Sequence, residues 1–175
     1  MEELILSNLE AYGFLAVIVW MFIEEFIGVP SVLAPMAAAY VVVETADPVY
    51  AFLQVFVVVA LLGSAASVAS SYATYAIGFY GGKTGVDRYG KYVGLKWSQI
   101  QKFEHYLTNG REHLYIAGLR AIPLMPLSVI SGASGFFRVN WKLYGFWSFI
   151  GMIPRNLFLG MLAWYLKDDF MSAVT

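Results

Sequence analysis

Long apolar blocks constrain the fold of this chain more than any other feature of its sequence. The block Val49–Tyr80 contains no charged side chain, and in the block Leu143–Leu166 Arg155 is the only charge. Because about 20 apolar residues are enough for a helix to cross a bilayer, both blocks predict transmembrane helices. The sequence therefore predicts an all-α, polytopic integral membrane protein.

The composition excludes the main alternatives. Hydrophobic residues make up 59% of the chain and charged residues 13%, about half of the usual charged share of roughly 25%. A soluble domain of this size needs more polar surface to cover its core. A soluble globular protein, a disordered chain and a nucleic-acid binder are therefore excluded, and residues 1–175 are expected to form a single membrane domain.

Two further apolar blocks, residues 11–43 and 114–137, are interrupted. In the first, the apolar pieces Ala11–Ile23 and Ser31–Val43 would each reach only about 20 Å as a helix, which is too short to cross. Each block is therefore expected to form a re-entrant hairpin that enters and leaves the membrane on one side. The residues expected to break these hairpins are Pro30, Pro35, Pro123, Pro126, Gly132 and Gly135.

The order of these segments has a two-fold pattern. It is hairpin 11–43, transmembrane helix 49–80, polar basic loop 81–113, hairpin 114–137 and transmembrane helix 143–166. An interrupted hairpin followed by a span, repeated with opposite orientation, is typical of transporters built from inverted repeats. The sequence thus predicts an inverted-repeat arrangement.

The basic residues indicate an orientation. All 11 Lys and Arg residues lie between Lys83 and Lys167, and the loop 81–113 holds many of them. Because Lys and Arg accumulate in cytoplasmic loops, we expect a multi-pass protein of the cell membrane with this loop in the cytoplasm.

Small residues recur every four positions in the second block, at Gly63, Ser67 and Ser71. This spacing lets helices approach closely within lipid and predicts a helix-packing face. A polar stripe that lines a path is the alternative interpretation.

Glu24 and Glu25 are the first candidate functional residues. A carboxylate deep in a bilayer is costly, so such a group faces a cavity, pairs with a cation or carries a proton. If the first hairpin is shallow, both side chains instead reach interfacial water.

Arg120 and Arg155 are the candidate cations of the second half. Arg120 lies just before Pro123, and its planar guanidinium suits a carboxylate or a phosphate; the alternative is that it extends to the membrane surface. Arg155 follows Pro154 and is expected either to bond backbone carbonyls that this proline frees or to bind an anion.

No motif for catalysis, a metal or a cofactor is present. The chain has no cysteine, and its two histidines, His105 and His113, lie outside any metal-binding motif. A membrane lipid phosphatase would need a nucleophile paired with a histidine, which the apolar blocks do not offer. We expect a non-enzymatic protein with no metal and no cofactor.

Four groups of residues resemble the DedA family, also called the SNARE-associated Golgi or VTT-domain family. They are Val29-Pro30-Ser31 after Glu24 and Glu25, Tyr75 with Gly78 and Gly82, Arg120-x-x-Pro123-x-x-Pro126 with Gly132 and Gly135, and Gly151-x-x-Pro154-Arg155 with Gly160. The resemblance implies two facing re-entrant hairpins and a role in moving lipids across membranes, coupled to protons in some members. It matches Glu24 or Glu25 with the membrane carboxylate of the family and Arg120 with its arginine. Many members carry an acidic residue where Ser71 stands here.

The expected function is therefore a lipid translocase, a flippase or scramblase, for an anionic lipid such as a polyprenyl phosphate or a phospholipid. Anionic lipid headgroups are the expected partners, protons are a second candidate, and a homo-oligomer is left open. The alternatives are a proton-coupled transporter of a small cation or drug and a non-catalytic membrane-organising protein.

Overall fold

The computed structural model describes residues 19, 22, 32–43, 45–89, 92, 96–108 and 110–174. These residues are helical and include no strand, which confirms the predicted all-α class. The helices are α2 (Leu33–Val42), α3 (Pro48–Gln54), η1 (Val55–Gly63), α4 (Ser64–Tyr89), α5 (Trp97–Lys102), α6 (Glu104–Leu107), α7 (Glu112–Ala121), α8 (Leu127–Phe136) and α9 (Trp141–Val174). Most of the predicted first hairpin, including Glu24, Glu25 and Pro30, lies outside the described residues.

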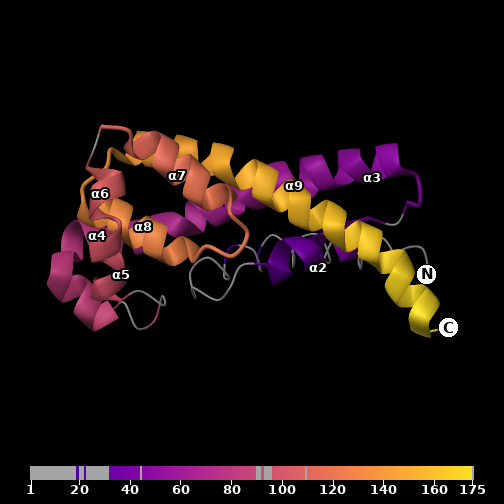
Figure 1. The fold of residues 1–175 in the computed structure, drawn as a ribbon, viewed down its shortest axis with the longest axis horizontal. Helices are drawn as coiled ribbons and strands as arrows, with labels where there is room; N and C mark the ends of the chain where they lie inside the picture. The colour runs from indigo at the N-terminus through magenta and orange to yellow at the C-terminus, as the bar shows by residue number, and fades with distance from the viewer. Residues whose placement is uncertain are drawn as a thin grey trace, which may run out of the picture.

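Helices α3, η1 and α4 follow one another as a long rod (Figure 1). The rod begins at Asp47, whose Oδ1 accepts hydrogen bonds from the backbone N–H groups of Val49 (2.8 Å) and Tyr50 (3.3 Å). Pro48 suits the first helical position because it has no N–H to satisfy. Within the described residues, Pro48–Arg88 and Trp141–Lys167 are long and apolar enough to cross a membrane, as predicted for 49–80 and 143–166.

The region 81–113 is more helical than the expected polar loop. Helix α4 continues to Tyr89 through a kink at Gly82 (φ 53°, ψ −148°), a conformation that glycine adopts readily. The short helices α5 and α6 then fold back on α8 and bury Ile100, Phe103 and Leu107. These scattered apolar residues explain why the segment packs despite its polar composition.

Helix α9 runs antiparallel to the rod. Three cross-helix hydrogen bonds set this direction: Trp164 Nε1 to the Thr45 carbonyl (3.0 Å), Asn156 Nδ2 to Ser64 Oγ (3.0 Å) and Tyr72 Oη to the Trp141 carbonyl (2.8 Å). The span Trp141–Lys167 therefore lies beside the part of the rod that ends near Tyr72, with polar bonds near both ends of this span and near its middle.

Helix α7 packs beside the first half of α9, and α8 packs on α4. Helix α7 lies along α9, with Ala117 against Gly151, and ends near Arg155, whose Nη2 donates to the Pro123 carbonyl (2.9 Å). Helix α8 then returns along α4. The non-helical turn of residues 122–126 therefore lies beside Arg155, far from Trp141 at the start of α9.

Helix α2 covers the other half of α9. Its small buried residues Ala34, Ala38 and Ala39 pack against η1 and α9, which is the close packing that small residues permit within lipid. Pro35 does not interrupt α2; it lies in the first turn, where its missing N–H leaves no intrahelical bond unmade.

Gly132 and Gly135 do not break the second hairpin. Both lie inside α8, and a Cβ on Gly135 would collide with the Tyr75 carbonyl oxygen. A Cβ on Gly78 of α4 would likewise collide with the Gly132 carbonyl oxygen. These glycines therefore bring the backbones of α4 and α8 together, while the break lies at Pro123 and at Pro126, the residue that precedes α8.

Candidate functional site

Arg120 lies in the last turn of α7 and is fully buried. Its Nη2 donates to Ser131 Oγ (2.7 Å) and to Tyr144 Oη (2.6 Å), and its Nη1 lies 3.3 Å from Met152 Sδ. The guanidinium carbon is 5.3 Å from the centre of the Tyr144 ring. Arg120 therefore lies at the junction of α7, α8 and α9, and its side chain is buried within the protein.

Tyr144 extends this network to α4. Its hydroxyl accepts from Arg120 and donates to Ser71 Oγ (2.8 Å), and Ser71 Oγ donates to the Val68 carbonyl (2.7 Å). Ser131 Oγ in turn donates to the Leu127 carbonyl (2.9 Å). Because each hydroxyl both accepts and donates, these contacts hold the guanidinium in one position.

Arg155 is the second buried cation, with 1% of its surface exposed. The sequence predicts bonds to carbonyls that Pro154 frees in its own helix, or anion binding. The structure gives a different acceptor, the Pro123 carbonyl on the turn between α7 and α8. Ile122 has extended backbone angles (φ −78°, ψ 121°), so this turn has left the helix and its carbonyls are available. Arg155 therefore connects α9 to the turn.

Two buried guanidinium groups next to one turn make an unusual electrostatic environment. Arginine stays charged at all relevant pH values, and charge in an apolar interior is costly unless it is paired or hydrogen-bonded. Among the described residues, Arg120 donates to the hydroxyls of Ser131 and Tyr144 and Arg155 donates to the backbone carbonyl of Pro123, and these acceptors are neutral oxygens. Such a site favours anions and disfavours a cationic ligand.

Further buried hydroxyl groups lie on α4, α8 and α9. Five of them, on Ser70, Thr74, Ser128, Ser134 and Ser148, have no hydrogen-bond partner among the described residues. A buried hydroxyl without a partner costs about 1–3 kcal/mol. The helices thus enclose a polar interior in a chain that is otherwise strongly apolar.

The three residues predicted for helix packing, Gly63, Ser67 and Ser71, are all buried on the rod. The structure also brings in residues that the sequence analysis missed, above all Tyr144 and Ser131. The serines at positions 128, 131 and 134, three apart within an apolar helix, are a signal that could have indicated a polar face. Tyr144 carried no such signal, because its role depends on helices distant in sequence.

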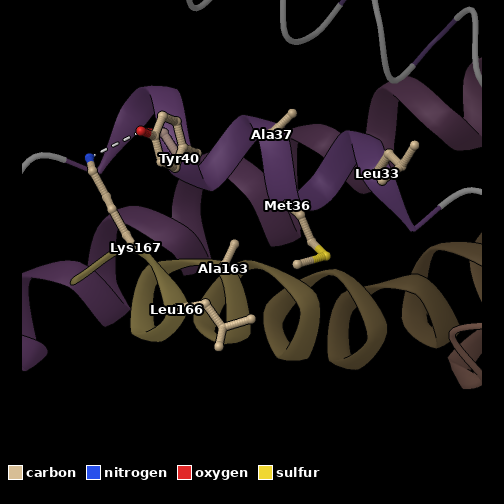
Figure 2. A pocket seen from close by; sticks show the side chains of 7 residues that line it. All are labelled: Leu33, Met36, Ala37, Tyr40, Ala163, Leu166 and Lys167. Atoms are coloured by element: carbon tan, nitrogen blue, oxygen red, sulfur yellow. Dashed lines mark hydrogen bonds between the residues drawn. The ribbon is translucent and has the colours of Figure 1, made fainter. Parts of the chain in front are cut away.

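A second feature of α9 is an apolar cavity of about 360 Å³ between α2 and the end of α9 (Figure 2). Tyr40 and Lys167 lie at one end and Leu33 at the other. Lys167 Nζ donates to the carbonyls of Val43 (2.9 Å) and Tyr40 (3.2 Å), and so caps the end of α2. Lys167, the cation of this cavity, thus has a structural role at the end of α2. In this respect the cavity differs from the polar interior around Arg120.

The described residues contain no group of three His, Cys, Asp or Glu side chains that could hold a metal ion. Glu24 and Glu25, the predicted carboxylates, lie outside the described part of the chain. The structure therefore places Arg120 and Arg155 at the α7–α8 turn and leaves the predicted pairing with a glutamate as a prediction.

Replacing Tyr144 by phenylalanine is expected to lower the stability of the protein by about 2 kcal/mol, because it removes one hydrogen-bond acceptor of the buried Arg120 and the hydroxyl that donates to the buried Ser71. The measurement is thermal unfolding in detergent micelles. Tyr165→Phe is the matched control, since Tyr165 is 66% exposed. Equal unfolding temperatures for the two variants would contradict the assigned role of Tyr144.

Comparison with known proteins identifies the family. The model of the VTT domain matches residues 29–165, a range that contains the α7–α8 turn and both arginines. The chain belongs to the VTT-domain family, the DedA family, as the resemblance in the sequence indicated. It is a membrane protein of this family with helices that are able to span a membrane.

One curated relative is the "Uncharacterized membrane protein YkoX" of Bacillus subtilis (strain 168). It is 30% identical over 96 residues, which cover 55% of this chain and 42% of the relative. The chain thus aligns with less than half of that protein. No solved structure matches.

Proposed function

We propose that this VTT-domain protein moves an anionic lipid, a phospholipid or a polyprenyl phosphate, across the cell membrane. The observation that carries the proposal is the pair of buried guanidinium groups, Arg120 and Arg155, beside the α7–α8 turn. A headgroup phosphate that crosses hydrocarbon needs a partner for its charge, and arginine binds phosphate through two parallel hydrogen bonds.

The arrangement of the helices supports a re-entrant hairpin. Arg155 lies roughly 20 Å along the helix axis from Trp141, at about 1.5 Å per residue. If α9 crosses the membrane, the turn beside Arg155 lies well inside a hydrocarbon core about 30 Å thick. Helices α7 and α8 then enter and leave at one end, and the basic segment at that end faces the cytoplasm.

Helix α2 supports the inverted repeat. It packs on the half of α9 that α7 leaves open, near Gly160 and Ala163. In the proposed arrangement, α2 belongs to the first hairpin, which dips in from the opposite face. The two hairpins would meet near the middle of the membrane, as in transporters built from inverted repeats.

In the proposed mechanism, the headgroup phosphate replaces the neutral acceptors of Arg120 and Arg155. The hydroxyls of Ser131 and Tyr144 release Arg120 to the phosphate and hold it again when the lipid leaves. The hydroxyls without partners, such as Thr74 and Ser134, solvate the headgroup along the path. Glu24 or Glu25 would carry the coupled proton, and no covalent step is needed.

The experiment is reconstitution of the full chain into liposomes. Movement of fluorescent phosphatidylglycerol is compared with that of phosphatidylcholine and with proton or cation flux in the same vesicles. Faster movement of the anionic lipid supports the proposal. Cation flux without lipid movement would favour a small-cation transporter, and no flux of either kind would favour a membrane-organising role; either result would overturn the proposal.

A further inference from the structure

A cavity of about 580 Å³ lies where α8 ends and α9 begins, against α4. Its lining is mainly aromatic, with Tyr72, Tyr75, Phe79, Tyr80 and Trp141, and Arg138 is its cation. The cavity lies at the end of the candidate membrane span Trp141–Lys167. Tyrosine and tryptophan gather at the headgroup level of bilayers, because their rings are apolar and carry one polar group.

The connection between α8 and α9 is fixed on the surface of α4. Tyr75 Oη donates to the Val139 carbonyl (2.5 Å), and Tyr72 Oη donates to the Trp141 carbonyl (2.8 Å). Asn140 Oδ1 accepts from the backbone N–H groups of Lys142 (3.0 Å) and Leu143 (3.4 Å) and so caps α9. The cavity is therefore a formed part of the fold.

Arg138 has a backbone conformation that its residue type disfavours. The N–H of Arg138 bonds the Gly135 carbonyl (3.0 Å), and the N–H of Val139 bonds the Ser134 carbonyl (3.0 Å). This pair of bonds is the Schellman motif, whose left-handed position is usually glycine. Here this position is occupied by Arg138, with φ 55°. Among the described residues, Arg138 is the only residue other than glycine that has a positive φ. Such strain points to a role for the side chain.

Two cations lie at or next to the cavity: Arg138 lines it, and Lys142 follows the lining residue Trp141 in the chain. Arg138 and Lys142 are both exposed; the guanidinium of Arg138 lies 5.4 Å from the centre of the Phe79 ring, and Lys142 Nζ lies 5.4 Å from that of Trp141. The residues that line this cavity include no acidic side chain. A cationic mouth with aromatic walls fits a phosphate headgroup at a membrane surface.

We propose that this cavity binds the phosphate headgroup of an anionic membrane lipid, with Arg138 as its main contact and Lys142 as its second. The acyl chains remain in the bilayer beside the helices. The cavity is separate from the buried site at Arg120, and its use as a loading site rests on the proposed lipid translocation. The binding itself does not depend on transport.

The test is lipid retention by the purified full chain, measured by native mass spectrometry with phosphatidylglycerol or phosphatidylcholine added to detergent micelles. Arg138→Gly is the decisive variant, because glycine suits the left-handed position and keeps the fold. We expect Arg138→Gly to bind phosphatidylglycerol about tenfold more weakly, as for the loss of one charged hydrogen bond. Its unfolding temperature should be equal to or above that of the unmodified protein.

Lys102→Gln is the matched control, since it removes an exposed cation of α5 that does not line the cavity. It should retain phosphatidylglycerol as the unmodified protein does. Unchanged retention by Arg138→Gly would overturn the proposal, and so would equal retention of phosphatidylcholine or displacement of the lipid by inorganic phosphate alone. Because no transport is measured, failure here leaves the translocation proposal standing, and failure in liposomes leaves this site standing.

Discussion

Replacing Arg120 by glutamine is expected to slow the movement of anionic lipid in liposomes by about 100-fold. This corresponds to a rise of roughly 2.7 kcal/mol in the activation free energy of lipid movement. The reason is that Arg120 is one of the two buried cations at the α7–α8 turn, and glutamine keeps a polar side chain without the charge. Arg120→Lys keeps the charge but loses the planar fork, so we expect an intermediate rate. Movement of labelled phosphatidylglycerol in reconstituted vesicles is the measurement.

Lys102→Gln serves as the control for this prediction, because it also removes one positive charge, from an exposed side chain of α5. It should leave the rate unchanged. Tryptophan fluorescence and size-exclusion profiles establish that each variant is folded. A folded Arg120→Gln protein that moves phosphatidylglycerol at the normal rate would refute the role of the buried cation.

The helices were predictable where apolar residues run without a break. The blocks 49–80 and 143–166 correspond to the candidate spans Pro48–Arg88 and Trp141–Lys167, because length and hydrophobicity alone determine whether a helix can cross a bilayer. The extension of α4 beyond Gly82 was not predicted. Its polar composition hides the few apolar residues, such as Val86, that pack it against the rest of the fold.

The candidate site was predictable only in part. An arginine within an apolar block is a local signal, and Arg120 and Arg155 are indeed buried. Their partners Tyr144 and Pro123 come from segments distant in sequence, and no local pattern encodes such a contact. Nothing in the sequence around Arg138 indicated a special role. Its positive φ, seen in the structure, distinguishes it from other surface arginines.

The glycines of α8 show a further limit of sequence reasoning. A glycine in an apolar block is compatible with a break and with a close helix contact, and the sequence alone does not separate the two. In the structure, Gly135 lies against the Tyr75 carbonyl and Gly78 against the Gly132 carbonyl. The break falls at Pro123 and Pro126, which lie between the end of α7 and the start of α8.

Gly135→Ala is expected to lower stability by about 3 kcal/mol, which corresponds to a fall of roughly 6–12 °C in Tm for a chain of this size. Its Cβ would collide with the Tyr75 carbonyl oxygen and lie 3.0 Å from the Phe79 backbone nitrogen, so α8 must move away from α4. In a helix free of such contacts the same substitution would stabilise by up to about 1 kcal/mol. Thermal unfolding in detergent micelles is the measurement.

Gly118→Ala is the matched control, because Gly118 lies within α7 and a Cβ there meets no atom within 4 Å. It should unfold at the same temperature as the unmodified protein or slightly higher. The two substitutions add the same methyl group to the two helices of one hairpin, so intrinsic helix propensity cancels between them. A difference in Tm therefore reports the close contact of α4 and α8 at Gly135, and equal values would show that this contact does not contribute to stability.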